Sequence, residues 1–163
     1  MTQAAPAVMP SSITEDVVIL LARASAAAVR AAQAALEPYG LRARHHAALR
    51  LAATGEGTAQ RQVAAALGLD PSAVVALVDD LEERRLVRRR PDPGDRRTRL
   101  ITLTADGAEL LRLTSDVVHE VQSRVMVNLP ESQRSDFVDL LRRVVGADGR
   151  ASGTNHPTTL TSR

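Results

Sequence analysis

The chain has 163 residues, 44% of them hydrophobic, and a formal net charge of +2. It has no cysteine, which excludes disulfides, thiolate nucleophiles, cysteine-based zinc sites and thiol redox sensing. No window is apolar over the length of a membrane span and no signal peptide is visible, so we expect one cytoplasmic domain with no membrane partner.

The two ends of the chain lack hydrophobic periodicity. Residues 1–11 include two prolines, and residues 147–163 are rich in glycine, serine and threonine. Both segments are predicted to be disordered tails. The ordered domain is therefore expected at residues 12–146.

Three helices are predicted before the middle of the chain. The first opens with a capping-box spacing at Ser12 and spans residues 12–36. The second spans residues 42–53. Thr58 is predicted to cap the third, at residues 59–67, which Gly68 ends in a left-handed conformation.

A fourth helix is predicted to start at Asp70-Pro71, a cap followed by proline in the first turn. Its apolar residues recur at helical spacing and predict one buried face made of Val74, Leu77, Val78 and Leu81. The third helix, the turn and the fourth helix together predict a helix-turn-helix.

An arginine-rich hairpin is predicted directly after this unit. Between Arg84 and Arg99 eight arginines stand against two aspartates, a local charge of +6, so the rest of the chain carries about −4. The segment 91–95 predicts a tight connection, with Asp95 holding the turn, and Thr104 is expected to end the second strand and cap the next helix. A positive charge focused on one hairpin indicates phosphate binding.

Two more helices are predicted, from Thr104 to about Val125 and from Pro130 to Val145. Their apolar stripes, like that of the first helix, exceed what the small core between them can cover. The expected partner for these surfaces is a second copy of the chain. The predicted fold is mainly α with a small β-hairpin, a winged helix-turn-helix with long N- and C-terminal dimerisation helices.

These segments resemble the MarR family of transcriptional regulators. The resemblance rests on residues 41–51, 63–70 and 74–87, on Asp95-Arg96-Arg97, and on the run from Leu103 to Gly107. It implies an obligate homodimer with dimerisation helices at 12–37 and 104–146 and a DNA-binding lobe at 41–103. It further implies repression at a pseudo-palindromic operator, relieved by a small anionic or phenolic effector.

Two departures from the family stand out. The groove-facing side of the fourth helix is apolar and acidic where the family commonly has polar readers, and Arg85 replaces the glycine frequent at the close of that helix. Wing arginines are therefore expected to carry a larger share of the affinity. The predicted DNA-contacting residues are Thr58, Gln60, Arg61, Ser72, Ala73, Val75, Ala76, Arg90, Arg96, Arg97 and Arg99.

The pair His45-His46 is the candidate effector site, with Arg23 as a further candidate. An imidazole there would bind a carboxylate or phenolate. The alternative interpretation is a packed histidine pair without a ligand. His119 lacks a second ligand at four-residue spacing, so no metal site is predicted, and no cofactor.

No catalytic constellation is predicted. The chain lacks a glycine-rich phosphate loop, a nucleophile elbow and a pocket-forming carboxylate pair, so we expect no enzyme activity. The alternative function is a DNA-architectural or partner-docking winged helix that has neither an operator nor an effector. Uniform, salt-sensitive binding to all duplexes would favour that alternative.

Overall fold

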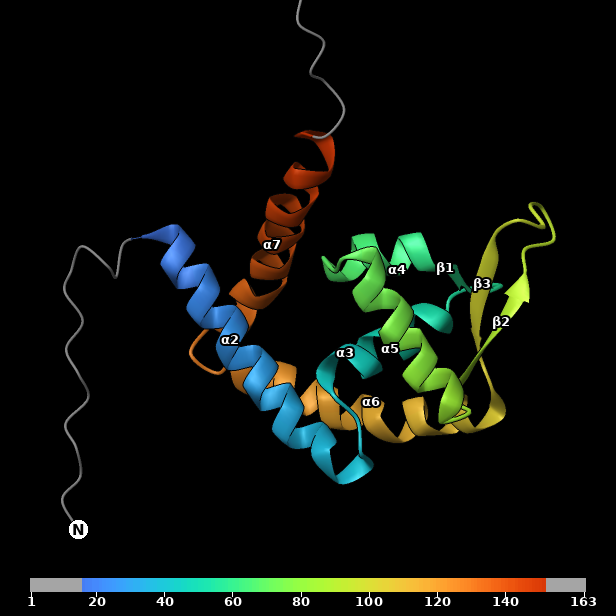
Figure 1. Cartoon of the computed structure of the whole chain (residues 1–163). Helices are drawn as coiled ribbons and strands as arrows, with labels where there is room; N and C mark the ends of the chain where they lie inside the picture. Colours follow the sequence, from blue (N-terminus) through green and yellow to red (C-terminus); the bar gives the residue numbers. More distant parts are fainter. Residues whose placement is uncertain (1–15, 152–163) are drawn as a thin grey trace, which may run out of the picture. The chain divides into compact units, whose positions relative to one another are not determined.

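The computed structural model describes the backbone of residues 16–151 and the side chains of residues 16–146. The described chain falls into two compact units, residues 16–125 and residues 126–151, and each is considered by itself. The first unit holds five α-helices, a short 3₁₀ helix and a small sheet, and the second holds one helix (Figure 1). The mainly helical fold with a small sheet is as predicted.

Helix α2 spans Val17–Leu36 and begins at Asp16, whose carboxylate accepts hydrogen bonds from the N–H groups of Val18 and Ile19. The capping box predicted at Ser12 lies outside the described residues. A 3₁₀ helix, η1 (Glu37–Tyr39), follows and ends at Gly40. Leu36 is buried, whereas the predicted stripe is exposed towards the start of α2, where Val17 is 65% exposed.

The segment Val17–Tyr39 is long and apolar enough to span a membrane, with a mean hydropathy of 1.4. The expectation that no segment of the sequence is apolar over the length of a membrane span was therefore wrong. Alanine-rich helices reach such values with few large side chains. Core helices of soluble proteins reach the same length and hydropathy.

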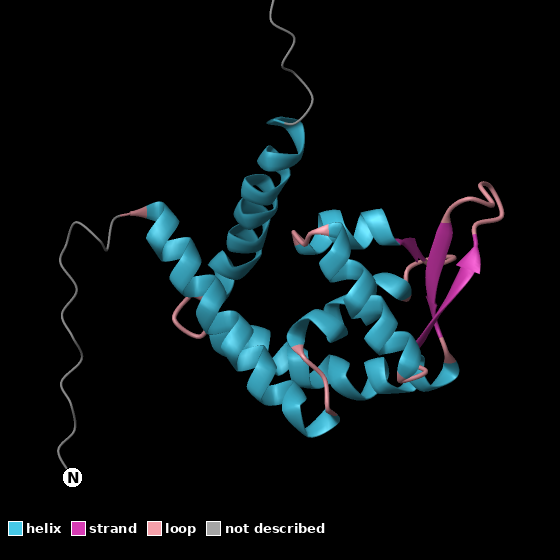
Figure 2. Ribbon diagram, in the orientation of Figure 1, coloured by secondary structure: helices cyan, strands magenta, loops and turns pink. Residues whose placement is uncertain are grey.

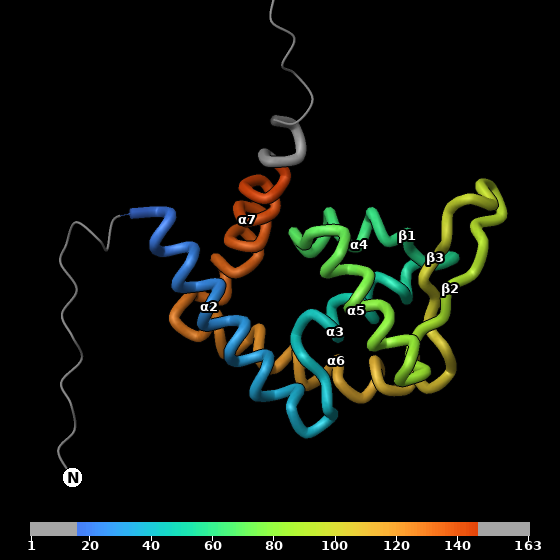
Figure 3. The backbone as a smooth tube through the Cα atoms, viewed as in Figure 1, coloured from blue at the N-terminus to red at the C-terminus, as the bar shows by residue number. Residues whose placement is uncertain are grey.

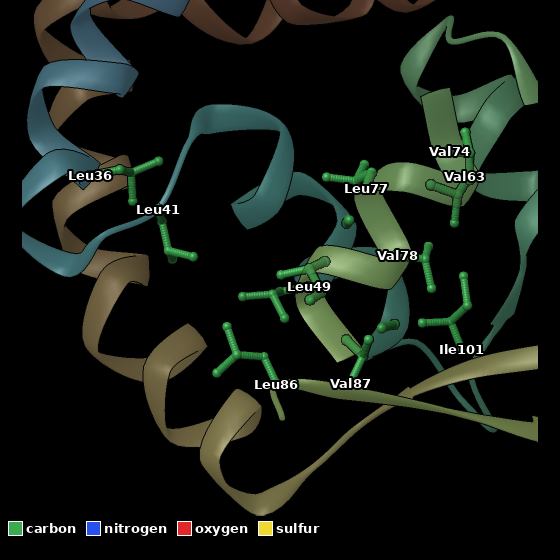
Figure 4. Close-up of a cluster of buried hydrophobic side chains, with 13 residues drawn as sticks. Leu36, Leu41, Leu49, Val63, Val74, Leu77, Val78, Leu86, Val87 and Ile101 are labelled. Atoms are coloured by element: carbon green, nitrogen blue, oxygen red, sulfur yellow. The ribbon is translucent and has the colours of Figure 1, made fainter. Parts of the chain in front are cut away.

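The helix-turn-helix lies in the first unit, where α3 (Ala43–Ala52), α4 (Gln60–Leu67) and α5 (Pro71–Glu83) enclose the hydrophobic core. The four α5 residues predicted to face inward are all buried, and Figure 4 labels Val74, Leu77 and Val78 among them. Leu49, Val63 and Ile101 approach them from α3, α4 and the sheet. This packing fixes α5 against the core and leaves its opposite side accessible.

The sheet has three antiparallel strands in the order β1–β3–β2, where the sequence predicted only a hairpin (Figure 2). Strand β2 (Val87–Pro91) pairs with β3 (Arg99–Leu103), and Val87 lies opposite Leu103. The added strand β1 is Thr58–Ala59, with Thr58 opposite Ile101. The prediction that Thr58 caps the third helix was wrong, because this residue pairs in the sheet and α4 begins after Ala59.

Helix α6 (Ala105–Val125) begins at the predicted cap: Thr104 Oγ1 accepts the N–H of Gly107 at 3.0 Å and donates to the Arg85 carbonyl at 2.6 Å. A Cβ on Gly107 would lie 1.9 Å from the Leu86 carbonyl oxygen. Only glycine permits this approach, which explains the spacing of threonine and glycine in the Leu103–Gly107 run.

Helix α7 (Glu131–Ala151) forms the second unit together with the turn before it. It extends past the predicted domain end at residue 146. Several of its large apolar side chains are exposed, among them Leu140 at 57% and Val145 at 71%. The predicted tail at residues 1–11, and the part of the other from residue 152 on, lie outside the described residues.

Candidate nucleic-acid interface

The turn between α4 and α5 has the geometry that the sequence predicts. Gly68 adopts φ +60°, and the N–H groups of Gly68 and Leu69 both donate to the Ala64 carbonyl. Asp70 precedes Pro71 in an extended conformation, although its carboxylate makes no capping hydrogen bond. Arg85 closes α5 with φ +58°, the left-handed conformation that glycine adopts at no steric cost. This explains why a glycine would suit position 85.

The accessible side of α5 is poor in hydrogen-bonding groups. Ser72, Val75 and Ala76 are exposed, and Ala73 is half-buried. Ser72 alone among these four predicted contacts carries a polar side chain, and the others offer methyl groups suited to thymine. Direct readout by this helix is therefore limited.

The turn of the wing, residues 92–98, extends beyond the ends of β2 and β3 (Figure 3). The Asp95 carboxylate accepts the N–H of Arg97 at 3.0 Å and the hydroxyl of Thr98 at 2.9 Å. These two hydrogen bonds lower the pKa of Asp95, and the positive charge of Arg61 adds to the effect. Asp95 thus holds the turn through backbone and hydroxyl groups rather than by pairing with a guanidinium.

Two wing arginines are held by carboxylates. Arg89 pairs with Asp79 at 2.5 Å and with Glu82, both on α5. The Arg90 guanidinium donates to the Glu56 carbonyl oxygen and lies 3.5 Å from the Glu56 carboxylate. Arg90, a predicted DNA contact, is therefore already engaged in the protein.

The remaining predicted wing contacts are accessible. Arg96, Arg97 and Arg99 are exposed, and so is Arg61 at the start of α4. Among residues 16–146, whose side chains are described, none of the four has an ion-pair partner. The Coulombic effect of Arg61 on the pKa of Asp95 places Arg61 near the wing turn. Among the predicted contacts, these four guanidinium groups are therefore free to meet a phosphate.

Thr58 and Gln60 differ from their predicted role. Thr58 is 5% exposed, and its hydroxyl lies 3.2 Å from Oε1 of Gln62. Gln60 is half-buried, and its Nε2 atom is buried without a hydrogen-bond partner among the described residues. Because strand β1 pairs at this position, Thr58 is directed into the protein and cannot serve as an exposed contact.

The structure separates the three residues predicted for effector binding. His45 lines a cavity between α3 and α5, whereas His46 lines another between α3 and α6. Arg23 is an exposed residue of α2 and lines neither cavity. Adjacent residues on a helix point about 100° apart, which accounts for the separation of the two histidines.

His45 is buried, and both ring nitrogens have partners. Nδ1 accepts the N–H of Arg42 at 3.2 Å, and Nε2 lies 3.1 Å from the Asp80 carboxylate on α5. Burial lowers the pKa of His45; Asp80 opposes this shift and nearby arginines reinforce it. The neutral ring therefore carries its proton on Nε2 and donates it to Asp80.

His46 is also buried, but its Nε2 atom has no partner among the described residues. Burial, and secondarily the charge of Arg50, lowers the pKa of His46. Its cavity has a volume of about 330 Å³ and is also lined by Arg50, Ser115, Asp116, Val118, His119 and Gln122. Among the described residues, no group of three or more histidine and acidic side chains is placed to hold a metal ion.

Besides the Arg90–Glu56 pair, two features of the site were missed from the sequence. The clamp on Arg89 was not predicted, although Asp79 and Glu82 at three-residue spacing form an acidic edge on one helix. The second missed feature is a group of arginines around His45. The closeness of Arg42 and Arg44 to His45 in the sequence could have indicated it.

Comparison with known proteins decides the family. A sequence model of the MarR family matches residues 39–98. The chain is 38% identical to CouR from Rhodococcus jostii RHA1, over 83% of this chain and 96% of CouR, with a TM-score of 0.77. It is 37% identical to a MarR-family transcriptional regulator from Rhodococcus sp. RHA1, over 83% and 98% of the two chains, with a TM-score of 0.76. The chain belongs to the MarR family.

Further matches support this assignment to the MarR family. BpsR of Bordetella bronchiseptica is 26% identical, over 90% of this chain and all of the BpsR chain, with a TM-score of 0.73. Two curated relatives carry names of transcriptional regulators: the repressor NicR of Pseudomonas putida and a putative regulatory protein for the hcr operon of Thauera aromatica. The alignments span 60% of the length of each. CouR was solved bound to p-coumaroyl-CoA, and the BpsR structure concerns regulation of its DNA binding by 6-hydroxynicotinic acid.

Proposed function

We propose that this MarR-family protein is a cytoplasmic transcriptional repressor that binds a pseudo-palindromic operator as a homodimer. In this proposal it has no enzymatic activity and no membrane partner. Support comes from the family assignment and from the regulators among its curated relatives. The observation that carries the proposal is the position of Arg96 and Arg97, exposed and without ion-pair partners among residues 16–146, on a turn held by Asp95 beside the helix-turn-helix.

The wing and the α4–α5 unit have different roles in this proposal. Arg61, Arg96, Arg97 and Arg99 contact phosphates or enter the minor groove, and Ser72 with its apolar neighbours enters the major groove. Thr58 and Arg90 are omitted, since one is buried and the other is held by Glu56. Gln60 is half-buried and is kept among the proposed DNA contacts only as a contact to the DNA backbone.

The test is selection of duplexes from a random library by the purified protein, followed by footprinting of the enriched sequence. A repressor of this kind should enrich an inverted repeat and protect both half-sites, because two-fold symmetry in the protein is mirrored in the operator. Binding of all sequences with equal affinity would contradict the proposal.

A second function is favoured by one observation, the scarcity of polar groups on the accessible side of α5. A winged helix that binds through arginines and phosphates alone would act as an architectural protein. The same selection experiment separates the two functions, because an architectural protein would enrich no sequence.

The homodimer is supported by apolar surfaces that the first unit does not cover. Val18 is 75% exposed and Val29 54% exposed on α2, and Leu140, Val144 and Val145 are exposed on α7. Large apolar side chains exposed on a helix favour an interaction site on that helix. We propose that a second copy covers it, since closed two-fold assemblies are the commonest for such chains.

The proposed effector is a small aromatic acid or its thioester, the class that CouR and BpsR suggest. The cavity beside His46 offers donors for a carboxylate: the neutral imidazole and the Arg50 guanidinium. Because His46 Nε2 lacks a partner among the described residues, a ligand there would satisfy a buried polar group.

Calorimetric titration with p-coumarate, p-coumaroyl-CoA and 6-hydroxynicotinate tests this site. His46→Gln and Arg50→Gln should each weaken binding of the active compound. The matched control is His45→Gln, because His45 is bonded on both nitrogens and lines the other cavity. Equal affinity in all variants would exclude the His46 cavity as the effector site.

A further inference from the structure

A second group of arginines surrounds a cavity between the start of α3 and α5, with a volume of about 510 Å³. Arg42 directly precedes α3, Arg44 lies in its first turn, and Arg84 directly follows α5. On α5 the cavity is lined by Ala76 and Asp80. At about 100° per residue, these lie on a different flank of the helix from Asp79 and Glu82, which hold the wing.

The three guanidinium groups are not neutralised by the side chains that the structure describes. Among residues 16–146, none of Arg42, Arg44 and Arg84 has an ion-pair partner. The carboxylate of Asp80 on the same wall is engaged by His45 at 3.1 Å. The cavity therefore carries a surplus of positive charge.

The three positive charges converge on His45. After burial, the causes that lower its pKa are Arg84, Arg44 and Arg42, which act against Asp80. Arg84 also lies over the turn before α3, since its Nη2 is 3.6 Å from where a Cβ on Gly40 would be. The arginines thus act on one point from two elements of the fold.

We propose that Arg42, Arg44 and Arg84 form a phosphate-binding site next to α5, separate from the wing. Arginine suits this ligand because its planar guanidinium donates two parallel hydrogen bonds to phosphate oxygens. The phosphate comes either from the backbone of bound DNA or from a small phosphorylated molecule. The DNA case rests on the proposed function.

Either source would act on the helix that carries the readout face. Ala73 and Ala76 belong both to the cavity wall and to the predicted groove-facing set. A DNA phosphate in the cavity would anchor the flank of α5 that the wing does not serve. A small phosphorylated ligand would occupy the same flank and so compete with DNA.

The experiment compares Arg42→Gln/Arg44→Gln with the parent protein. The matched control is Arg112→Gln/Arg124→Gln, which removes the same charge from exposed side chains of α6. Each protein is titrated with inorganic pyrophosphate by calorimetry, and its affinity for the selected duplex is measured as a function of salt. Thermal unfolding shows whether each variant is folded. Both measurements are repeated on Arg84→Gln, whose side chain lines the cavity from the end of α5.

A small-molecule site predicts that pyrophosphate binds the parent and the control, and that binding weakens about tenfold in the cavity variants. A DNA site predicts that pyrophosphate does not bind. It also predicts that the slope of log DNA affinity against log salt concentration falls in the cavity variants only, by about 0.9 for each phosphate that is no longer neutralised. If neither measurement separates the cavity variants from the control, the proposal is overturned. Failure of the parent to select any duplex would instead contradict the proposed function and leave the pyrophosphate result standing.

Discussion

Arg89 of the wing lies 2.5 Å from Asp79 of α5, and the same guanidinium also pairs with Glu82 one turn later. The Arg89 side chain is 23% exposed, so this two-carboxylate clamp is partly shielded from solvent. It joins the strand that carries the basic hairpin to the helix proposed to enter the major groove. The distance between the two proposed DNA-contacting elements is therefore set within the protein.

Arg89→Met should destabilise the fold, because it leaves two carboxylates together without their cation. A decrease of about 1–2 kcal/mol in the free energy of unfolding is expected for a partly buried pair, measured by urea denaturation. Arg88→Met is the control: Arg88 is the neighbouring residue on the other face of β2, exposed and without an ion-pair partner among residues 16–146. Equal stability of the two variants would show that the clamp contributes nothing.

Arg96→Ala and Arg97→Ala should each weaken binding to the selected duplex by about 1–3 kcal/mol if the arginine makes a close groove contact. The salt slope should fall by about one where the arginine neutralises a phosphate in the parent complex. Fluorescence anisotropy at several salt concentrations measures both quantities. Arg112→Ala, on the exposed side of α6, should bind as the parent does. Parent-like binding by both wing variants would mean that the wing does not anchor the complex.

Charge on the exposed face of α2 should dissociate the proposed dimer. Val29→Glu places a carboxylate at a residue that is 54% exposed, where burial against a second copy would remove it from water. Sedimentation should then show a monomer. Val75→Glu, at an exposed valine of α5, should remain dimeric and lose DNA binding instead. A parent protein that sediments as a monomer at micromolar concentration would refute the dimer itself.

The sequence pattern does not decide which apolar residues of a helix face a second copy, and this is why the substitution is placed at Val29. The apolar stripe on α6 was assigned to a dimer interface as a whole, yet Val121 is 5% exposed in the single chain while Leu113 is 46% exposed. Periodicity identifies an apolar face but does not say whether the same chain or a second copy covers it. A charge at Val121 would therefore disrupt folding rather than report on dimerisation.

Local rules predicted the helix-turn-helix and the wing well. The buried face of α5, Gly68 and Thr104 follow from periodicity and capping, which act over a few residues. Strand β1 was missed because two residues carry no periodic signal and pair with Ile101, far along the chain. The Arg90–Glu56 pair was missed for the same reason. Long-range pairing decides which arginines remain available, and no local pattern encodes it.

Acidification should destabilise the protein through the two buried histidines. The pKa values of His45 and His46 are lowered in the folded state, mainly by burial, from an ordinary value of 6.5. Well above pH 6.5 both rings are neutral whether the chain is folded or unfolded, and they contribute no pH dependence. Below that value the unfolded chain takes up protons that the folded chain resists. The free energy of unfolding should therefore fall from pH 7.5 to 5.5, by at most about 1.4 kcal/mol per pH unit for each proton.

Urea denaturation at pH 7.5, 6.5 and 5.5 measures this dependence of stability on pH. The slope should be reduced in His45→Gln/His46→Gln, because glutamine takes up no proton in this range. It should be retained in His119→Gln, since the His119 side chain is exposed and its substitution leaves both buried rings in place. A stability that rises on acidification would mean that ion pairing with Asp80, rather than burial, governs the protonation of His45.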